Sequence, residues 1–207
     1  MAQQASLREI WLLYIPAPGT AAGVARLAEQ AGFDGLCFAD TQCLAADVYT
    51  ALALAASHTE RLWLGTGVTN PVTRHPAVTA GAIATLQVES GGRAVLGMGR
   101  GDSSLAHLGR EPAPVAAFER YLRAVQGYLC GEAVDQDGHP SRLEWLAGAG
   151  MPKVPVDVAA TGPRMIGLAA RLAERVSFAV GAEPERVRQA IETARRAREQ
   201  AGLDPAD

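Results

Sequence analysis

The sequence predicts an α/β protein built on a parallel sheet, and three observations support that fold class. Short apolar stretches alternate with amphipathic stretches along the chain, and loops rich in Gly, Asp or Pro join them. The apolar stretches lack the alternation of a sheet with one wet face, so helices should cover both faces. No linker or low-complexity segment divides the 207 residues, which predicts a single domain over 1–207.

Six strand–helix units follow one another in order. Gly32 stands where the first helix would end, since glycine readily adopts the left-handed conformation of a C-terminal cap. Pro76 stands at the favoured first position of the third helix. Turn signals at residues 137–140 (DGHP) leave the stretch between the fourth and fifth units irregular. The expected strands and helices are 10–16 with 21–32, 35–40 with 47–58, 61–69 with a helix from Pro76, 93–99 with 115–129, 154–160 with 163–174, and 175–181 with 184–201.

Composition excludes several classes of function. The formal charge is −3, and the basic residues are spread among acids, so no nucleic-acid partner is expected. The three cysteines show neither C-x-x-C pairing nor zinc spacing, which indicates a reducing cytoplasm and no metal. No apolar run reaches membrane-spanning length, and the run at 10–15 lacks the flanks of a signal peptide. A cytoplasmic protein without a membrane partner is the expectation.

The stretch VLGMGRGDSS, residues 95–104, raises the question of a nucleotide loop. Its glycines follow the spacing G-x-G-x-G, whereas the Rossmann fingerprint needs G-x-G-x-x-G at the start of a helix. The next clear helical pattern begins only near Val115. The spacing therefore gives little support to a dinucleotide fold.

The number of units bears on the architecture. Six units favour an open doubly wound sheet, because a closed barrel needs eight. The chain also stops at GLDPAD, directly after a helix, where a further strand would be expected. These two observations predict a domain that is incomplete at its C-terminus.

Polar and glycine-bearing loops follow the strands, at the edge where ligands bind in either architecture. Asp40 ends the second strand, and residues 67–76, 99–103 and 161–164 follow the next three. Backbone N–H groups at a helix start suit a phosphate, and an arginine could add a charged hydrogen bond. On spacing alone, however, the Gly-Pro pair within 161–164 is better explained as an ordinary helix start.

Residues 64–104, LGTGVTNPVTRHPAVTAGAIATLQVESGGRAVLGMGRGDSS, resemble the bacterial luciferase-like superfamily. They are most similar to the branch of deazaflavin-dependent methylenetetrahydromethanopterin reductases. Residues 28–40 and 154–182 fit the same family in the same order. The resemblance implies a TIM-type (β/α)8 barrel, of which this chain would hold about six units. It also implies that a reduced flavin or deazaflavin binds at the mouth of the barrel.

The resemblance assigns cofactor contacts to three loops. A bulge in the third strand, often with a cis non-proline peptide bond, would support the ring system of the cofactor. The loops after the fourth and fifth strands would approach its phosphate. The implied cofactor-binding residues are Gly67, Val68, Asn70, Arg100, Gly101, Ala160, Thr161, Gly162, Pro163 and Arg164.

Two aspartates are the candidate catalytic residues. Asp40 lies at a strand end, where acids often act on protons, although it could also cap its loop. Asp102 could position the ring or donate a proton, or could cap the DSS turn. The first strand lacks the glutamate found in the reductases that the chain resembles. His75 is expected to form hydrogen bonds at a helix end, and Trp63 is expected in the core.

Three functions remain open. The first is hydride transfer between reduced deazaflavin (coenzyme F420) and a small organic substrate. The second is an FMN-dependent monooxygenase that uses molecular oxygen, and the third is a non-catalytic flavin-binding protein or inactive fragment. The missing units favour the third function, and the intact phosphate loops favour the first two. Arg74, Arg100 and Arg164 could border an exit for the acidic tail of F420, which favours that cofactor over FMN.

Unpaired barrel edges predict a homo-oligomer, most simply a dimer.

Overall fold

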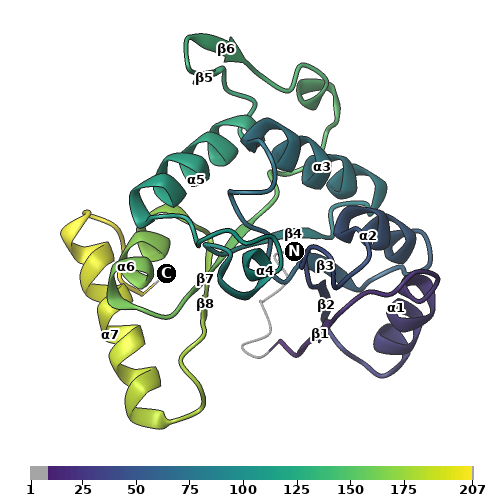
Figure 1. The fold of residues 1–207 in the computed structure, drawn as a ribbon, viewed down its shortest axis with the longest axis horizontal. Helices are drawn as coiled ribbons and strands as arrows, with labels where there is room; N and C mark the ends of the chain where they lie inside the picture. Colours follow the sequence, from purple (N-terminus) through teal and green to yellow (C-terminus); the bar gives the residue numbers. More distant parts are fainter. Residues whose placement is uncertain (1–8, 207) are drawn as a thin grey trace.

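The computed structural model describes residues 9–206 and contains a six-stranded parallel sheet (Figure 1). The strand order is β1-β2-β3-β4-β7-β8, so each strand lies beside its neighbour in the chain. Strands β1 and β8 form the two edges of this sheet. The strand bounds are β1 Trp11–Tyr14, β2 Gly35–Phe38, β3 Trp63–Thr66, β4 Ala94–Met98, β7 Val156–Ala160 and β8 Arg175–Phe178.

This sequential order corrects one expectation and confirms another. A doubly wound sheet reverses its strand order partway across, and this sheet does not. The open-sheet expectation is therefore wrong, because the number of strands says nothing about the direction in which successive units wind. The barrel-type winding that the resemblance implies is confirmed, as a curled half-barrel of six strands.

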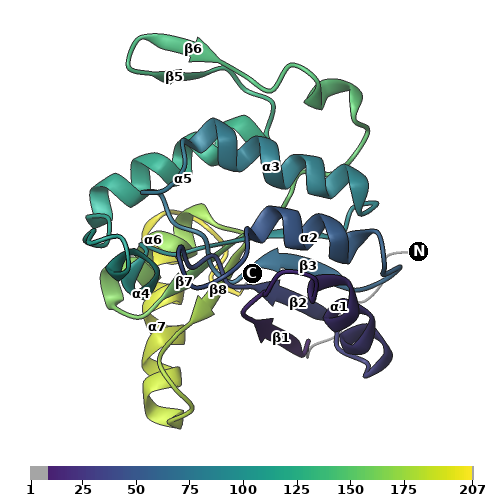
Figure 2. The same ribbon diagram turned by 45° about the vertical axis from the view of Figure 1, so that its right-hand side comes forward.

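The helices form an arc around one face of the sheet (Figures 1 and 2). Consecutive units that return in the same right-handed sense place their helices on the same side. Within residues 9–206, no helix is both long enough and apolar enough to cross a bilayer. The helix bounds are α1 Ala21–Gln30, α2 Val48–Ala56, α3 Pro76–Glu89, α5 Val115–Leu129, α6 Pro163–Leu172 and α7 Pro184–Gln200.

The hydrophobic core lies between the sheet and these helices. Alternate strand residues such as Leu36, Phe38 and Met98 are completely buried there. The opposite, inner face of the sheet is more open, and Leu13 on it is 62% exposed. Trp63 is 36% exposed, so its expected place in the core is wrong. A strand can bury only the residues that point toward the helices, and Trp63 starts its strand.

Local sequence signals explain two helix ends. Gly32 has φ +83° and donates to the Glu29 carbonyl at 3.2 Å, which confirms the expected C-terminal cap of α1. Pro76 is the first residue of α3, as expected. The Nδ1 atom of His75 accepts a hydrogen bond from the Ala77 N–H at 3.2 Å. The helix-end function expected of His75 is thereby confirmed.

The stretch expected to be irregular contains an antiparallel hairpin, β5 (Val134–Gln136) and β6 (His139–Ser141). It projects beyond α3 and α5, and a short helix, η1 (Leu146–Gly148), follows it (Figure 2). Asp137 and Gly138 have φ values of 56° and 84°, typical of a tight hairpin turn. The turn signal there is confirmed. The signal at His139-Pro140 is wrong, because an edge strand tolerates proline.

One helix was not expected. Helix α4, Asp102–Ala106, follows β4 directly and is only five residues long. Gly101 precedes it with φ 94°, a conformation that favours glycine. A helix of five residues is too short to show a repeating pattern of apolar residues. After β4, the first stretch of sequence with such a helical pattern is therefore α5.

Candidate functional site

A cavity of about 550 Å³ opens at the carboxyl ends of β3, β4, β7 and β8. Parallel strands bring these ends to one edge, which is where ligands bind in such folds. Within residues 9–206, no group of three or more His, Cys, Asp or Glu is placed to hold a metal ion. The cavity is lined by Thr41, Gly67, Val68, Gly99, Arg100, Gly101, Asp102, Ser103, Ser104, Val115, Ala159, Thr161, Gly162, Pro163, Arg164, Met165 and Ala179.

Residues 67–70, here called the bulge wall, form one side of the cavity. The peptide bond between Gly67 and Val68 is cis, as expected from the resemblance. The Thr69 N–H donates to the Gly97 carbonyl at 2.9 Å, and the Gly99 N–H donates to the Thr69 carbonyl at 2.8 Å. The bulge wall is therefore joined to β4 by backbone hydrogen bonds. That this wall supports a cofactor ring stays a prediction.

The glycines of the G-x-G-x-G stretch serve the bulge wall and the turn beside it. A Cβ at Gly97 would overlap the Thr66 carbonyl oxygen, and one at Gly99 would lie 2.8 Å from Cγ2 of Val68. Gly101 has φ 94° and turns the chain into α4. Two of the three glycines therefore allow close packing, and the third makes a turn. This division explains why the spacing differs from a dinucleotide fingerprint.

Residues 161–164, here called the rim, form the opposite side. Gly162 is the N-cap of α6 and Pro163 its first residue. No heavy atom lies within 4 Å of the position that a Cβ on Gly162 would take. Among residues 9–206, none accepts a hydrogen bond from the exposed Arg164 guanidinium. The rim thus offers an open helix start and an unpaired cation.

Arg100 and Asp102 face the cavity from the loop after β4. Arg100 donates from Nη1 to the Ala113 carbonyl at 3.2 Å. Its Nη2 lies 3.7 Å from Oδ1 of Asp102, whose side chain is 75% exposed. Asp102 therefore keeps a solvent-accessible carboxylate at the cavity.

Most of the predicted site residues line the cavity, but Asp40, Asn70 and Ala160 do not. Ala160 is 2% exposed and packs in the core, and its neighbour Ala159 lines the cavity instead. A shift of one residue along a strand exchanges the two faces, so Ala160 can offer only its backbone. Strand alternation also places Ala179 at the cavity. Ser104 was missed together with α4, whereas Ser103 belongs to the loop at 99–103 that the sequence places at this edge.

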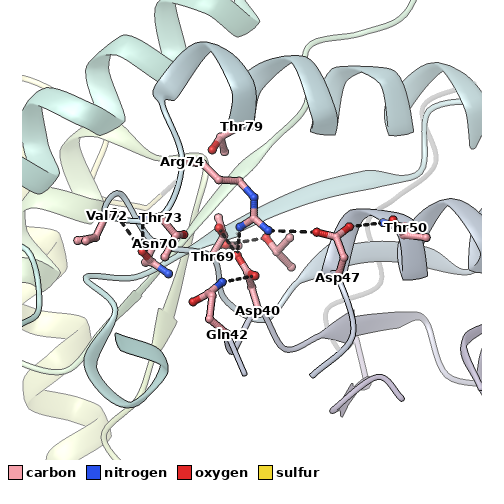
Figure 3. A network of polar contacts seen from close by, with 12 residues as sticks. Asp40, Gln42, Asp47, Thr50, Thr69, Asn70, Val72, Thr73, Arg74 and Thr79 are labelled. Carbon is pink, nitrogen blue, oxygen red and sulfur yellow. Dashed lines mark hydrogen bonds and ion pairs between the residues drawn. The ribbon is translucent and has the colours of Figure 1, made fainter. Parts of the chain in front are cut away.

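Asn70 lies just beneath the loop at Gly101. Its Oδ1 accepts hydrogen bonds from the N–H groups of Val72 at 3.0 Å and Thr73 at 3.1 Å (Figure 3). Its Nδ2 is buried, and no described residue accepts a hydrogen bond from it. A Cβ at Gly101 would lie 3.0 Å from the Asn70 Cβ. A buried amide donor without a partner therefore lies beside the cavity.

Asp40 is 4% exposed, and both of its carboxylate oxygens have partners (Figure 3). Oδ1 accepts from Nε2 of Gln42 at 2.8 Å, and Oδ2 accepts from Oγ1 of Thr69 at 2.7 Å. Oδ2 also pairs with the guanidinium of Arg74. The structure therefore places Asp40 behind the bulge wall. The prediction that it exchanges protons with a substrate stays a prediction.

Arg74 is held by this buried network. Its Nη2 lies 3.3 Å from Oδ2 of Asp47, and its guanidinium carbon lies 5.0 Å from the ring centre of Tyr49. Burial alone would lower the pKa of Arg74, but the hydrogen bond and charge of Asp40 raise it. Burial also raises the pKa of Tyr49. Because Arg74 is paired and does not line the cavity, the expected basic exit is reduced to Arg100 and Arg164.

Sequence reasoning missed one ionisable residue below the cavity. Asp157 lies two residues before Ala159, on the same inner face of β7. Burial raises the pKa of Asp157, and Ser177 Oγ donates to its Oδ2 at 2.8 Å while Oδ1 has no partner among the described residues. Burial, together with the charge of Asp157, raises the pKa of Cys37 to about 12. The sequence search considered only residues at the carboxyl ends of strands, and Asp157 lies within its strand, so the search did not find it.

The fold and the cavity are those of a barrel-type α/β protein with its site at the carboxyl ends of the strands. The family model described as luciferase-like monooxygenase matches residues 3–207, and the chain belongs to that family. The superfamily resemblance of the sequence is confirmed.

The similar proteins include a reductase and a dehydrogenase. The chain is 35% identical to a 5,10-methylenetetrahydromethanopterin reductase of Methanolobus tindarius, over 87% of this chain and 56% of that protein. It is 38% identical to an F420-dependent glucose-6-phosphate dehydrogenase of Beutenbergia cavernae, over 72% of this chain and 48% of that protein. The chain therefore spans about half the length of these relatives.

A solved structure shows the same fold. The coenzyme F420 dependent tetrahydromethanopterin reductase from Methanopyrus kandleri superposes with a TM-score of 0.79 at 26% identity. The superposition covers 95% of this chain and 62% of that structure.

Proposed function

We propose that this protein is an oxidoreductase that transfers a hydride between reduced coenzyme F420 and a small organic substrate. The relative from Beutenbergia cavernae and the solved structure from Methanopyrus kandleri are both described as F420-dependent enzymes. Because the chain spans only part of each of these proteins, their activity supports the proposal and does not establish it. The site must therefore be judged on its own residues.

The open rim is the observation that carries the proposal: Arg164 has no partner among the described residues, and Gly162 begins α6 in open space. Free N–H groups at a helix N-terminus and an unpaired guanidinium suit a phosphate group. F420 carries such a phosphate on its ribityl chain. The cavity volume of about 550 Å³ also falls in the usual range for small-molecule sites. The residues present therefore fit a flavin-like group.

The assignment of the two sides follows from their chemistry. The bulge wall offers an apolar surface at Gly67 and Val68, and suits the ring. The rim suits the phosphate, because α6 directs its N-terminal N–H groups there and Arg164 adds a positive charge. Gly101 would let the backbone approach the phosphate from the other loop.

When bound, reduced F420 supplies a hydride, because carbon replaces the N5 atom of a flavin. The bulge wall would orient the ring, and the loops would exclude water from one side of it. Asp102 is the better placed of the two carboxylates to move a proton, since it lines the cavity and its side chain is exposed. Asp40 is better suited to hold the bulge wall, because both of its oxygens are occupied.

The experiment that tests the proposal compares F420 with FMN. The purified chain is titrated with each cofactor, and oxygen uptake is measured with each reduced form. We expect tighter binding of F420, and no oxygen uptake by its reduced complex. Preferential binding of FMN together with oxygen uptake would support the monooxygenase instead.

The FMN-dependent monooxygenase stays the second candidate, because the family description itself names that activity. FMN and F420 share a phosphate on the ribityl chain, so the rim cannot separate them. Beyond the phosphate, F420 carries an acidic tail, and Arg100 and Arg164 lie where a tail could leave the cavity. A non-catalytic flavin-binding protein is the third candidate, because the first strand has no carboxylate. Binding of either cofactor without turnover would favour it.

A homo-oligomer, most simply a dimer, is part of the proposal. The sheet has two edge strands, and the apolar side chains of Leu13 and Ile15 at one edge are 62% and 61% exposed. Exposed edges and apolar patches promote association. Light scattering of the purified chain measures its mass directly, and a monomeric mass would contradict this part.

A cytoplasmic location is also proposed, supported by three free cysteines.

A further inference from the structure

We propose that Arg74 is a positioning residue: by pairing with Asp40 it fixes Thr69, and through Thr69 the bulge wall of the cavity. The proposal rests on the proposed function only where it gives the bulge wall a cofactor to hold. The positioning itself concerns contacts within this chain, so it can be tested without a cofactor.

The guanidinium of Arg74 joins the loop after β2 to helix α2. It pairs with Asp40 after β2 and reaches Asp47 at the start of α2 (Figure 3). It also lies over the ring of Tyr49 in α2. The Arg74 side chain is only 18% exposed. The ion pair of an arginine this enclosed differs from an exposed ion pair, which contributes little to the free energy of folding.

Asp40 depends on this arginine for its charge. Its other partners, Gln42 and Thr69, are neutral donors. A buried carboxylate without a counter-charge is strongly unfavourable, so loss of one partner destabilises the arrangement. Without Arg74, the buried Asp40 carboxylate would lose its counter-charge and would have to rearrange toward water. That change weakens the acceptor that holds the Thr69 hydroxyl.

Thr69 passes this constraint to the cavity. Its side chain is bound to Asp40, and its backbone bonds to Gly97 and Gly99 of the neighbouring strand. It directly follows Val68, which lines the cavity. Thr69 is therefore held from two sides, and loss of the side-chain contact would leave its backbone hydrogen bonds to Gly97 and Gly99 freer to open.

The backbone of Arg74 is also fixed. Its carbonyl accepts a hydrogen bond from the Tyr121 hydroxyl at 3.0 Å, and that hydroxyl lies 2.6 Å from Oγ1 of Thr79. Tyr121 belongs to α5, so a further element anchors the loop. The guanidinium is thus directed toward Asp40 by contacts at both ends of the residue.

The direct test is amide hydrogen exchange on the cofactor-free chain. Arg74→Met keeps an unbranched aliphatic stem and removes the charged guanidinium. We expect the Thr69 and Gly99 amides to exchange at least tenfold faster, with the Leu64 amide in β3 unchanged. Arg123→Met is the matched control, because Arg123 is 59% exposed and, among the described residues, pairs only with Glu119 on α5. It should leave all three amides unchanged.

Two outcomes would overturn the proposal. Unchanged exchange at Thr69 and Gly99 would show that Arg74 does not hold them. Equal acceleration at Leu64 would show a merely global effect on stability. If Arg74→Met does not fold, Arg74→Lys replaces it. Lysine keeps the charge without the planar fork, so a smaller acceleration confined to the same two amides is expected. Uniform or absent acceleration again contradicts the proposal.

Cofactor titration adds a readout that stability alone would not move. The Kd for F420 should rise about 5- to 50-fold in the folded Arg74→Met chain. The Asp40→Asn/Arg74→Met double variant should bind no more weakly than Arg74→Met, since both act through one contact. Additive losses would contradict the proposal. If the unaltered chain binds neither F420 nor FMN, the proposed function fails, and the exchange result still decides the role of Arg74.

Discussion

The bulge wall and the rim face each other across one cavity, yet they are built in opposite ways. On the bulge wall, Thr69 is bonded through its backbone to Gly97 and Gly99 and through its side chain to Asp40. On the rim, Arg164 has no partner among the described residues, and Gly162 lies in open space. The comparison teaches that the chain itself fixes the shape of the bulge wall, without a ligand. The rim instead keeps a positive charge that a ligand can pair with.

The largest effect should follow from breaking the packing behind the bulge wall. Gly97→Val would drive a side chain into the Thr66 carbonyl, and neither strand can move without losing its hydrogen bonds. We expect a loss of about 3 kcal/mol in the free energy of unfolding, at the top of the range for overpacked cores. Denaturant titration measures it. Gly162→Ala is the control, and a comparable loss there would mean that the two sides do not differ in packing.

The rim should respond in affinity and not in stability. Arg164→Ala removes a charged hydrogen bond to the phosphate, worth roughly 1.5–3 kcal/mol of binding free energy. The melting temperature should stay the same, because Arg164 has no partner among residues 9–206. Calorimetric titration with F420, alongside Arg123→Ala, provides the comparison. An unchanged Kd would remove the rim from the site.

The Asp40→Asn variant distinguishes two roles for Asp40: proton transfer to a substrate and positioning of the bulge wall. Asp40→Asn keeps an acceptor for Thr69 but puts an uncharged amide beside Arg74, so the bulge wall should loosen. We expect F420 affinity to fall by roughly 1 kcal/mol, the scale of one hydrogen bond. If affinity is unchanged while turnover falls, Asp40 acts on protons, as the sequence predicts.

The smallest effect concerns the inner face below the cavity. Burial raises the pKa of Asp157, so the folded chain holds this proton to a higher pH than the unfolded chain does. Its stability contribution is therefore present at low pH and is lost as pH rises through the raised pKa. Asp157→Asn should raise Tm at pH 7 by no more than a few degrees, and should change nothing near pH 3. Asp137→Asn, at the hairpin tip, is the control, and a gain independent of pH would contradict this explanation.

The unequal success of sequence prediction follows from the same physics. Strand–helix alternation is a long-range repeated signal, and the six strands and the helices that follow them were found at their places. Helix α4 was too short to show a period, and the choice between Ala160 and Ala159 depended on which face of β7 points inward. Arg74 was expected at an exit because its loop follows a strand end. Its pairing with Asp40 joins residues 34 positions apart, which no local pattern encodes.

The central claim is that the cavity binds F420 with its phosphate at the rim and its ring on the bulge wall. The most direct measurement compares the Kd of F420 with that of its phosphate-free deazaflavin core, for the unaltered chain and for Arg164→Ala. We predict that F420 binds at least tenfold more tightly than the core to the unaltered chain, and that most of this difference disappears in Arg164→Ala. Equal affinity for the two compounds in the unaltered chain, or no binding of either, would contradict the claim.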